Sequence, residues 1–328
     1  MAASALLVTM KHLILVGACY LDTILSLPSY PQEDSKLRAS DLKIRRGGNC
    51  PNTMEVILQL LTEHDEVTLY LVSVLPSRAC SATESILSSF QGNKAAKFEH
   101  CIHREDHATA ASAYILRSQE TGSRTIINYN DLPEMTVDEF RAIAQDFSPS
   151  QDTWWHFEGR IPNTTKECIQ IVHQLHPDAP VSIEIENPGR AGLEELAGLA
   201  DVVFYSRAWA QSRQYKSAQE CLKGEGLQSP TQKAVSLCTW GEEGAALYKR
   251  PDGDLYQYSA KETGTGDVQV IDSVGAGDVF IAGILYAFLC RGTAWSHRES
   301  LMFAVNLATK KVQQEGFSHL GEVCWRPL

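Results

Sequence analysis

The sequence predicts an α/β fold: a single domain, residues 1–328, built as a three-layer sandwich around a mostly parallel β-sheet, with a small β-sheet lid. Two observations predict it. Short apolar runs alternate with longer segments of helical spacing along most of the chain, and two segments, about 22–45 and 110–130, break that alternation. No repeat or Pro/Ser-rich linker divides the chain, and its length is enough to bury one large core.

The alternating segments give the main sheet and its helices. The expected strands are Leu13–Val16, Val67–Val74, Val181–Ile185, Val202–Tyr205 and Ala234–Cys238, and the expected helices are Asn52–Leu61, Thr164–Leu175 and Leu193–Leu199. Strands joined through helices pair in parallel, so this order predicts a parallel sheet covered by helices.

The two segments that break the alternation predict β-hairpins. In the second, Tyr114–Leu116 and Thr125–Ile127 flank a Gln-Glu-Thr-Gly turn. Strands inserted between strand–helix units must pack outside the main sheet, and a lid over its edge would exclude water from a reaction. The alternative is a surface hairpin without a role in the reaction.

Composition excludes several classes of partner. The formal net charge of −11 argues against broad nucleic-acid or anionic-membrane binding. The nine cysteines are scattered without a Cys-x-x-Cys pair, which favours reduced thiols and a cytoplasmic location. We expect no segment long enough to cross a bilayer. The apolar N-terminus resembles a secretory signal, but Lys11 and His12 interrupt it, so a buried strand from Leu13 is preferred.

The most informative motif is Asp272-Ser-Val-Gly-Ala-Gly-Asp278, followed by an apolar helix over Val279–Leu289. Gly275, Ala276 and Gly277 let the backbone bring its N–H groups against a phosphate, and the helix N-terminus adds positive potential. Asp278 would then be the general base for an acceptor hydroxyl. We expect the helix dipole to weaken this base. The alternative is that Asp278 is only a helix cap.

This motif, with Ala282-Gly283, resembles the C-terminal signature of the ribokinase-like (PfkB) carbohydrate kinases. Arg46-Gly-Gly-Asn49 matches the family's N-terminal Gly-Gly pair. Segments in the same order as in the fructose-phosphorylating branch extend the resemblance over nearly the whole chain: Tyr30–Ser35, Arg45–Asn52, Gly122–Ile126, His156–Arg160, Glu184–Pro188 and Thr239–Ala245. The resemblance implies a ribokinase-like fold and transfer of the ATP γ-phosphoryl group to a sugar, above all D-fructose, giving fructose 1-phosphate.

The resemblance also implies roles for individual residues. The sugar-binding candidates are Asp22, Asp34, Gly48, Asn49 and Asn52, which offer fixed hydrogen-bond donors and acceptors. Arg124 would approach the transferring phosphate, and Gly241, Glu242, Glu243 and Gly244 would border the nucleotide with Gly275–Gly277. Simpler interpretations remain open: Asp22 as a turn residue, Asn49 as a helix cap and Arg124 as a solvated lid residue.

The sequence departs from the family where Asn-x-x-Glu usually organises Mg²⁺, because Ser206-Arg-Ala-Trp209 stands there. Glu184 and Glu186 are the replacement candidates, acting through water, although they also fit an alternating strand face. The resemblance further allows a monovalent cation such as K⁺. Glu315-Gly-Phe-Ser318 keeps only part of the glycine-rich pattern expected near the adenine.

Three functions remain open from the sequence. The preferred one is a fructose kinase, the second is a kinase for another ketose, ribose or a nucleoside, and the third is a catalytically weak metabolite-binding regulator. We also expect a homodimer through the lid, because Leu37, Tyr114, Leu116 and Ile127 are too many apolar residues for a thin β layer to bury alone.

Overall fold

The computed structural model describes residues 10–90, 92–228, 235–250, 252–263 and 268–324. Within these residues the main sheet has nine strands. In spatial order they are β15 (Asp254–Tyr258), β14 (Ala245–Lys249), β13 (Val235–Thr239), β12 (Val202–Tyr205), β11 (Val181–Ile185), β10 (Asp152–Glu158), β1 (Lys11–Val16), β4 (Val67–Val72) and β6 (Ala96–Lys97). The strands from β13 to β6 pair in parallel and the β13–β14–β15 edge is antiparallel, which confirms the predicted mostly parallel sheet.

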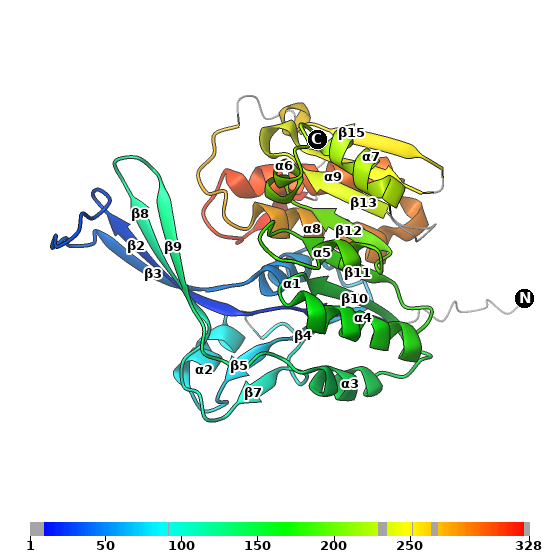
Figure 1. Ribbon diagram of the computed structural model, residues 1–328, viewed down its shortest axis with the longest axis horizontal. Helices are drawn as coiled ribbons and strands as arrows, with labels where there is room; N and C mark the ends of the chain where they lie inside the picture. The colour runs from blue at the N-terminus through cyan, green and yellow to red at the C-terminus, as the bar shows by residue number, and fades with distance from the viewer. Residues whose placement is uncertain (1–9, 91, 229–234, 251, 264–267, 325–328) are drawn as a thin grey trace, which may run out of the picture.

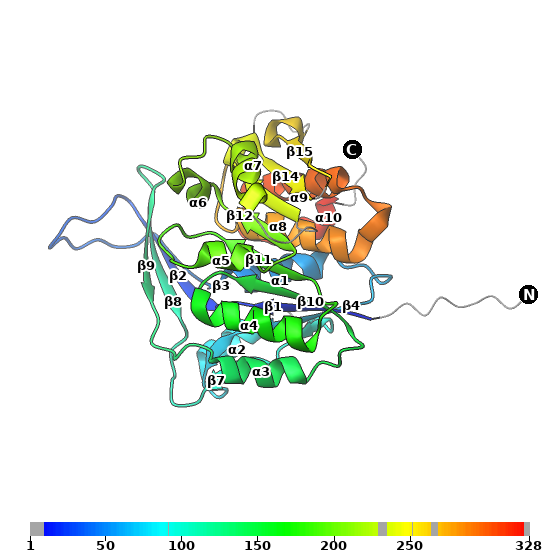
Figure 2. The same ribbon diagram turned by 45° about the vertical axis from the view of Figure 1, so that its right-hand side comes forward.

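Helices cover both faces of this sheet (Figures 1 and 2). One core lies under α1 (Asn49–Leu60), α8 (Ala276–Tyr286) and α9 (His297–Val312), with α2 (Ser81–Ser88) and α10 (Leu320–Cys324) at its margin. The other lies under α3 (Val137–Gln145), α4 (Pro162–Leu175), α5 (Leu193–Ala197), α6 (Arg207–Ser212) and α7 (Ala218–Gln228). The three-layer sandwich is therefore as predicted.

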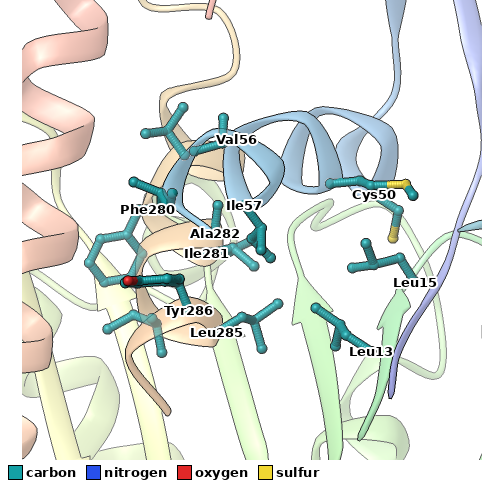
Figure 3. Packing of buried hydrophobic residues seen from close by; sticks show 14 of the residues in the cluster. Leu13, Leu15, Cys50, Val56, Ile57, Phe280, Ile281, Ala282, Leu285 and Tyr286 are labelled. Atoms are coloured by element: carbon teal, nitrogen blue, oxygen red, sulfur yellow. The ribbon is translucent and has the colours of Figure 1, made fainter. Parts of the chain in front are cut away.

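The core that carries α8 is dense. Figure 3 shows Leu13 and Leu15 of β1 with Ile57 of α1 and Leu285 of α8, all of which are fully buried. Burial of each such side chain stabilises the fold by about 1.5–3 kcal/mol, so α1 and α8 are held firmly on the sheet. The start of α8 is thereby fixed relative to the strand ends.

The segment Ala276–Ala294, which contains α8 and the π-helical turn Ala287–Arg291, is apolar and long enough to span a membrane by length and composition alone. This differs from our expectation that no segment reaches that length. Because 61% of its most apolar window is buried inside the protein, the segment is accounted for as a core helix.

One expected strand needs correction. The strand expected over Val67–Val74 is split at Ser73, because β4 pairs with β1 whereas β5 (Val74–Pro76) pairs with β7 (Ile102–Arg104) in a separate two-stranded sheet. The strand expected over Ala234–Cys238 is present as β13 over Val235–Thr239, and Ala234 itself lies outside the described residues. The buried strand expected near Leu13 is confirmed as β1, inside the sheet between β10 and β4.

The two expected hairpins form one four-stranded sheet, here called the lid: β3 (Asp41–Gly47), β2 (Tyr20–Leu27), β8 (Ser112–Ser118) and β9 (Arg124–Tyr129). Pairs β2–β3 and β8–β9 are antiparallel, and β2–β8 is parallel. The lid projects away from the helix-covered body (Figure 1).

The two faces of the lid differ in chemistry. The residues Arg45, Asp22, Ala113 and Asn128 lie side by side across the four strands and form part of the inner lid face. The neighbouring row, Ile44, Thr23, Tyr114 and Ile127, lies on the outer lid face. Ile44, Tyr114 and Ile127 are 61%, 43% and 54% exposed, so the outer lid face is an uncovered apolar surface.

Candidate active site

Asp278 lies in the first turn of α8, as the glycine motif predicts. The N-cap of α8 is Gly275, whose φ of 76° and contact with the Phe317 ring leave no room for a side chain. A Cβ at Gly277, by contrast, would meet nothing within 4 Å. The backbone at Gly277 is therefore open to a ligand beside Asp278, and the first N–H groups of a helix have no partner within it.

A buried chain of hydrogen bonds orients Asp278. The Asn52 amide Nδ2 donates to Asp278 Oδ2 at 2.8 Å, and Arg46 Nη1 donates to Asn52 Oδ1 at 3.0 Å. Arg46 also pairs with Glu55 and stacks over the Phe90 ring. Because Arg46 donates to Oδ1 of Asn52, the Nδ2 end of that amide faces Asp278 and bonds to its Oδ2.

Glu184 and Glu186 extend from the carboxyl end of β11. Asn49 Nδ2 donates to Glu184 Oε2 at 2.7 Å and to Glu186 Oε2 at 2.9 Å, so the two carboxylates converge on one point. Glu184 is buried and Glu186 is exposed. Two converging carboxylates with one solvated side fit a hydrated Mg²⁺ ion.

His156 supports Glu184 from beneath. Trp154 Nε1 donates to Ser182 Oγ at 2.9 Å, which leaves the Ser182 hydroxyl hydrogen for His156 Nδ1 at 2.8 Å. His156 Nε2 then donates to Glu184 Oε1 at 3.0 Å. Burial lowers the pKa of His156 to about 3, so the ring is neutral. Cys50, His156 and Glu184 are close enough to share a metal ion, but both ring nitrogens of His156 are already used.

Burial and mutual repulsion raise the pKa of three carboxyl groups. Burial and then Glu184 raise the pKa of Glu158 to about 7, and burial and then Glu186 raise the pKa of Glu184 to about 8. Burial, followed by the charge of Glu184, raises the pKa of Asp278 well above its ordinary value, although the Asn52 bond opposes this. These effects make Asp278 a stronger base, contrary to the weakening expected from the helix dipole.

Two adjoining cavities meet at these residues. The smaller, about 90 Å³, is lined by Asn49, Glu184, Glu186, Gly277 and Asp278, among others. The larger, about 540 Å³, lies between the inner lid face and the strand ends and is lined by Asp22, Gly48, Asn49, Ile126, Asn128, Glu158, Glu186, Asn187, Arg190 and others. Because Asn49, Glu186 and Ser206 line both, the two cavities form one continuous site.

Three of the five predicted sugar-binding residues line this site. Asp22 and Asn49 offer a carboxylate and an amide, and Gly48, with a φ of 104°, would collide with the Ala18 carbonyl if it carried a side chain. Asn52 lines neither cavity, and its side chain is hydrogen-bonded to Asp278 and Arg46. Asp34 lies exposed in the loop between β2 and β3 and lines neither cavity.

Arg124 lies at the start of β9, paired across the lid with Arg117, and it too lines neither cavity. The strand period puts it on the same face as Ile126 and Asn128, which do line the larger one. Arg124 therefore points from the inner lid face but lies farther along the strand than the site.

The predicted nucleotide turn follows β13, next to Thr239 of the smaller cavity. Gly241 and Gly244 have φ values of 60° and 78°, which favour glycine. Glu242 and Glu243 are exposed, and Glu242 forms an ion pair with Lys261 at 3.5 Å. The two glycines shape the turn, whereas the two glutamates face solvent.

Sequence reasoning did not assign Arg46, Glu158, His156 or Asn128 to the site. Glu158 ends β10, and its Oε2 accepts from the Ala18 N–H at 2.8 Å. The sequence did contain a signal for Glu158. This residue follows an apolar run, and a ligand site is expected where the carboxyl ends of adjacent parallel strands meet at one edge of the sheet. Asn128 lay within the expected lid, but its face depends on strand register.

The chain is similar to known carbohydrate kinases in sequence and in fold. Residues 10–322 match the pfkB family carbohydrate kinase model. Mouse (Mus musculus) ketohexokinase is 30% identical over 315 residues, which cover 94% of this chain and 98% of the mouse protein. This agrees with the sequence prediction, in which ketohexokinase is the family member that the chain most resembles.

Solved ribokinases share the fold at lower identity. The Thermotoga maritima enzyme has a TM-score of 0.73 at 16% identity, covering 96% of this chain and 98% of that one. The Arabidopsis thaliana enzyme, solved with ribose and ATP, has a TM-score of 0.73 at 17% identity, covering 97% of this chain and 100% of that one. These likenesses confirm the ribokinase-like fold. The family match over residues 10–322 and the 30% identity with mouse ketohexokinase show that the chain belongs to the pfkB family of carbohydrate kinases.

Proposed function

We propose that this carbohydrate kinase transfers the γ-phosphoryl group of ATP to D-fructose and yields fructose 1-phosphate. The observation that carries the proposal is the position of Asp278. It lies where a cleft lined by side chains that can hydrogen-bond a sugar meets the open backbone of Gly277. The choice of fructose follows the 30% identity with mouse ketohexokinase. ATP as the donor follows the family and the Arabidopsis ribokinase solved with ATP.

In the proposed reaction the sugar lies in the larger cavity, where the Asp22 carboxylate and the amide oxygen of Asn49 accept hydrogen bonds from its hydroxyls. The reacting hydroxyl points at Asp278 Oδ1, since Oδ2 is engaged by Asn52. The sugar oxygen forms a bond to the γ-phosphorus while the bond from that phosphorus to the β-bridging oxygen breaks. The hydroxyl proton passes to Asp278, and ADP leaves with the broken bond's electron pair.

The backbone around Gly277 has a separate task in this proposal. N–H groups at the start of α8 stabilise the charge that develops on the transferring group, and their fixed position avoids reorganisation during the reaction. Within the loop, Ala276 N–H already donates to Ser273 O at 3.3 Å and Val274 N–H to Asp272 Oδ1 at 3.0 Å. The anion hole predicted over Gly275–Gly277 is therefore centred on Gly277.

Glu184 and Glu186 would hold Mg²⁺ through its water ligands. When bound, Mg²⁺ neutralises charge on the phosphates of the nucleotide. Asn49 and His156 would keep the two carboxylates converged, and Glu184, whose pKa is raised to about 8, would release its proton when the ion binds. This arrangement would replace the absent Asn-x-x-Glu pattern at Ser206–Trp209.

We further propose that the outer lid face packs against the lid of a second copy. Burying Ile44, Tyr114 and Ile127 in this way would remove an apolar surface that a monomer leaves in water. The inner lid face carries Asp22 and Asn128 of the sugar cleft, so a partner that stiffens the lid would also order that cleft. The cytoplasmic location stays a prediction.

The test is an acceptor panel. Purified protein with Mg²⁺ and ATP would be assayed for ADP release with D-fructose, other ketoses, ribose and adenosine, and the product would be identified by phosphorus NMR. We expect the highest kcat/KM with D-fructose and a 1-phosphate product. A preference for ribose or adenosine would replace fructose with the second candidate function, and binding without turnover would favour the regulator.

A further inference from the structure

Lys311 carries a buried positive charge directly behind the glycine motif. Its side chain is 0% exposed, although it belongs to the last turn of α9. The ammonium Nζ donates to the backbone oxygen of Asp272 and to Asp272 Oδ2, both at 2.8 Å. Complete burial of a lysine is rare because desolvation costs several kcal/mol, so the pairing must be close.

Asp272 connects this charge to the loop that leads to Asp278. Its Oδ1 accepts from Val274 N–H at 3.0 Å, inside the loop. The loop is tied to the end of α9 as well, because Ile271 N–H and Asp272 N–H both donate to Val312 O. Lys311 also lies 5.5 Å from the Phe317 ring, which packs against Gly275. Lys311 thus binds both the carboxylate and the backbone oxygen of Asp272, the residue at which the glycine-rich turn begins.

A monovalent cation, which the family resemblance allowed, does not fit at Asp272. To order the loop without blocking phosphate, an ion would have to lie on the protein side, among these oxygens. The ammonium already occupies that position, and Arg45 of β3 places a second positive charge 3.8 Å from Asp272 Oδ2. A further cation would meet two positive charges and one negative charge, so its binding is disfavoured.

The ionisation of the pair agrees with this arrangement. Burial lowers the pKa of Lys311, and the hydrogen bond to Asp272 opposes the effect. Burial alone would raise the pKa of Asp272, but the bonds from Lys311 and Val274 outweigh it and lower the pKa. The carboxylate is therefore ionised and available to the ammonium at neutral pH.

We infer that Lys311 is the cation that holds the phosphate-binding loop 272–278, so that the loop takes no alkali cation at Asp272. Lys311 is a positioning residue: it acts on the nucleotide through Asp272 and the backbone at Gly275–Gly277. The inference rests on the proposed function only in assigning that backbone to the phosphates of the nucleotide.

The wild-type protein gives the first test. ADP affinity by calorimetry and the sugar-kinase rate would be measured with N-methylglucamine as the only monovalent cation, and again with KCl at equal ionic strength. We expect both quantities to change by less than about twofold. A tenfold or greater gain in ADP affinity on adding K⁺ would overturn the inference, because the loop would then need an external cation.

Substitutions give the second test. Lys311→Met keeps the length of the side chain and removes its charge, and we expect ADP affinity to fall about tenfold or more while D-fructose affinity changes little. Lys223→Met, at an exposed position on α7, is the matched control for the loss of one charge and should bind ADP like the wild type. An unchanged ADP affinity in Lys311→Met would contradict the assignment.

Lys311→Arg and Lys311→Ala separate the effect of charge from that of packing. Lys311→Arg should retain more ADP affinity than Lys311→Met, and added K⁺ or methylammonium should restore part of the ADP affinity of Lys311→Ala. If neither variant differs from Lys311→Met, packing rather than charge matters and the inference fails. If these variants do not fold, the wild-type cation test decides alone. A protein that binds ADP independently of K⁺ but phosphorylates no sugar would refute the proposed function and leave this inference intact.

Discussion

The floor of the site and the lid above it are built in opposite ways. The floor, meaning Asn52, Glu158, Glu184 and Asp278, is buried and held by hydrogen bonds between elements of the core. The lid is a single β layer whose outer face leaves Ile44 and Ile127 exposed. On the proposed function, the floor fixes the geometry of phosphoryl transfer, whereas the lid encloses the sugar and is ordered by a second copy of the chain.

The largest effect is expected from the floor. Asp278→Asn should lower kcat by a factor of about 10² or more, because the amide cannot accept the hydroxyl proton and general-base catalysis typically contributes that much. Steady-state kinetics with D-fructose and ATP would measure it. Asp178→Asn, at an exposed position in the turn after α4, is a suitable control and should keep its activity. A kcat within a fewfold of wild type in Asp278→Asn would show that Asp278 is not the general base.

The second effect concerns Glu184 and Glu186, the carboxylates that we propose hold Mg²⁺. Glu184→Gln should raise the Mg²⁺ concentration needed for half-maximal rate by about 10-fold to 100-fold, the range seen when groups around a metal are changed. Since burial and Glu186 raise the pKa of Glu184 to about 8, the wild-type Mg²⁺ requirement should also fall as pH rises from about 6.5 to 8.

Glu167→Gln on the exposed surface of α4 is the control for that variant, and its Mg²⁺ requirement should not change. An identical Mg²⁺ titration for Glu184→Gln and wild type would show that the ion is held elsewhere.

The lid predicts a smaller effect on catalysis and a clear one on assembly. Ile127→Glu puts a charge on the outer lid face and should convert a dimer to a monomer, with a KM for D-fructose raised by a fewfold and a smaller change in kcat. Sedimentation at micromolar concentration, together with kinetics, would measure both. Met10→Glu, an exposed apolar residue outside the lid, should remain dimeric. A wild-type monomer with full activity would break the proposed dependence of the lid on a partner.

The smallest effect is on stability in the absence of Mg²⁺. The folded-state pKa values of Glu158 and Glu184 are raised to about 7 and about 8, so the folded protein binds more protons than the unfolded chain up to that pH. Stability should therefore fall as pH rises from 6.5 to 8. Below this window His156, with a pKa lowered to about 3, has the opposite effect.

Thermal unfolding would measure this dependence. Glu184→Gln should flatten it and raise Tm at pH 8 by a few degrees relative to wild type. A steeper or unchanged dependence in Glu184→Gln would mean that titration of Glu184 is not the cause of the pH dependence.

Much of the fold follows from local sequence pattern. The strands Val181–Ile185 and Val202–Tyr205 begin and end where the apolar runs predict, because both are fully buried parallel strands bounded by polar segments. The split at Ser73 was not predictable, since the residues on both sides are apolar and only pairing with different neighbours separates β4 from β5. The union of two hairpins into one lid likewise depends on the long-range β2–β8 pairing.

The site was predictable where one short motif specifies both backbone and side chain, as at Gly275–Asp278. It was less predictable where a role depends on contacts between distant segments. Asn52 lies near the Gly-Gly pair and was expected to bind sugar, but its contacts with Asp278 and Arg46 arise only from the packing of α1 on α8. Lys311 lies on α9, and its burial against Asp272, 39 residues away, left no local signal.

The central claim is that Asp278 acts on the chemical step, at a site that the core has already assembled. Its most direct test is a single-turnover experiment on Asp278→Asn, with D-fructose and ATP saturating and their affinities measured by calorimetry on the same sample. We predict affinities within about threefold of wild type and a transfer rate lower by about 10² or more. A wild-type rate of transfer, or a loss of sugar binding large enough to explain the slower turnover, would contradict the claim.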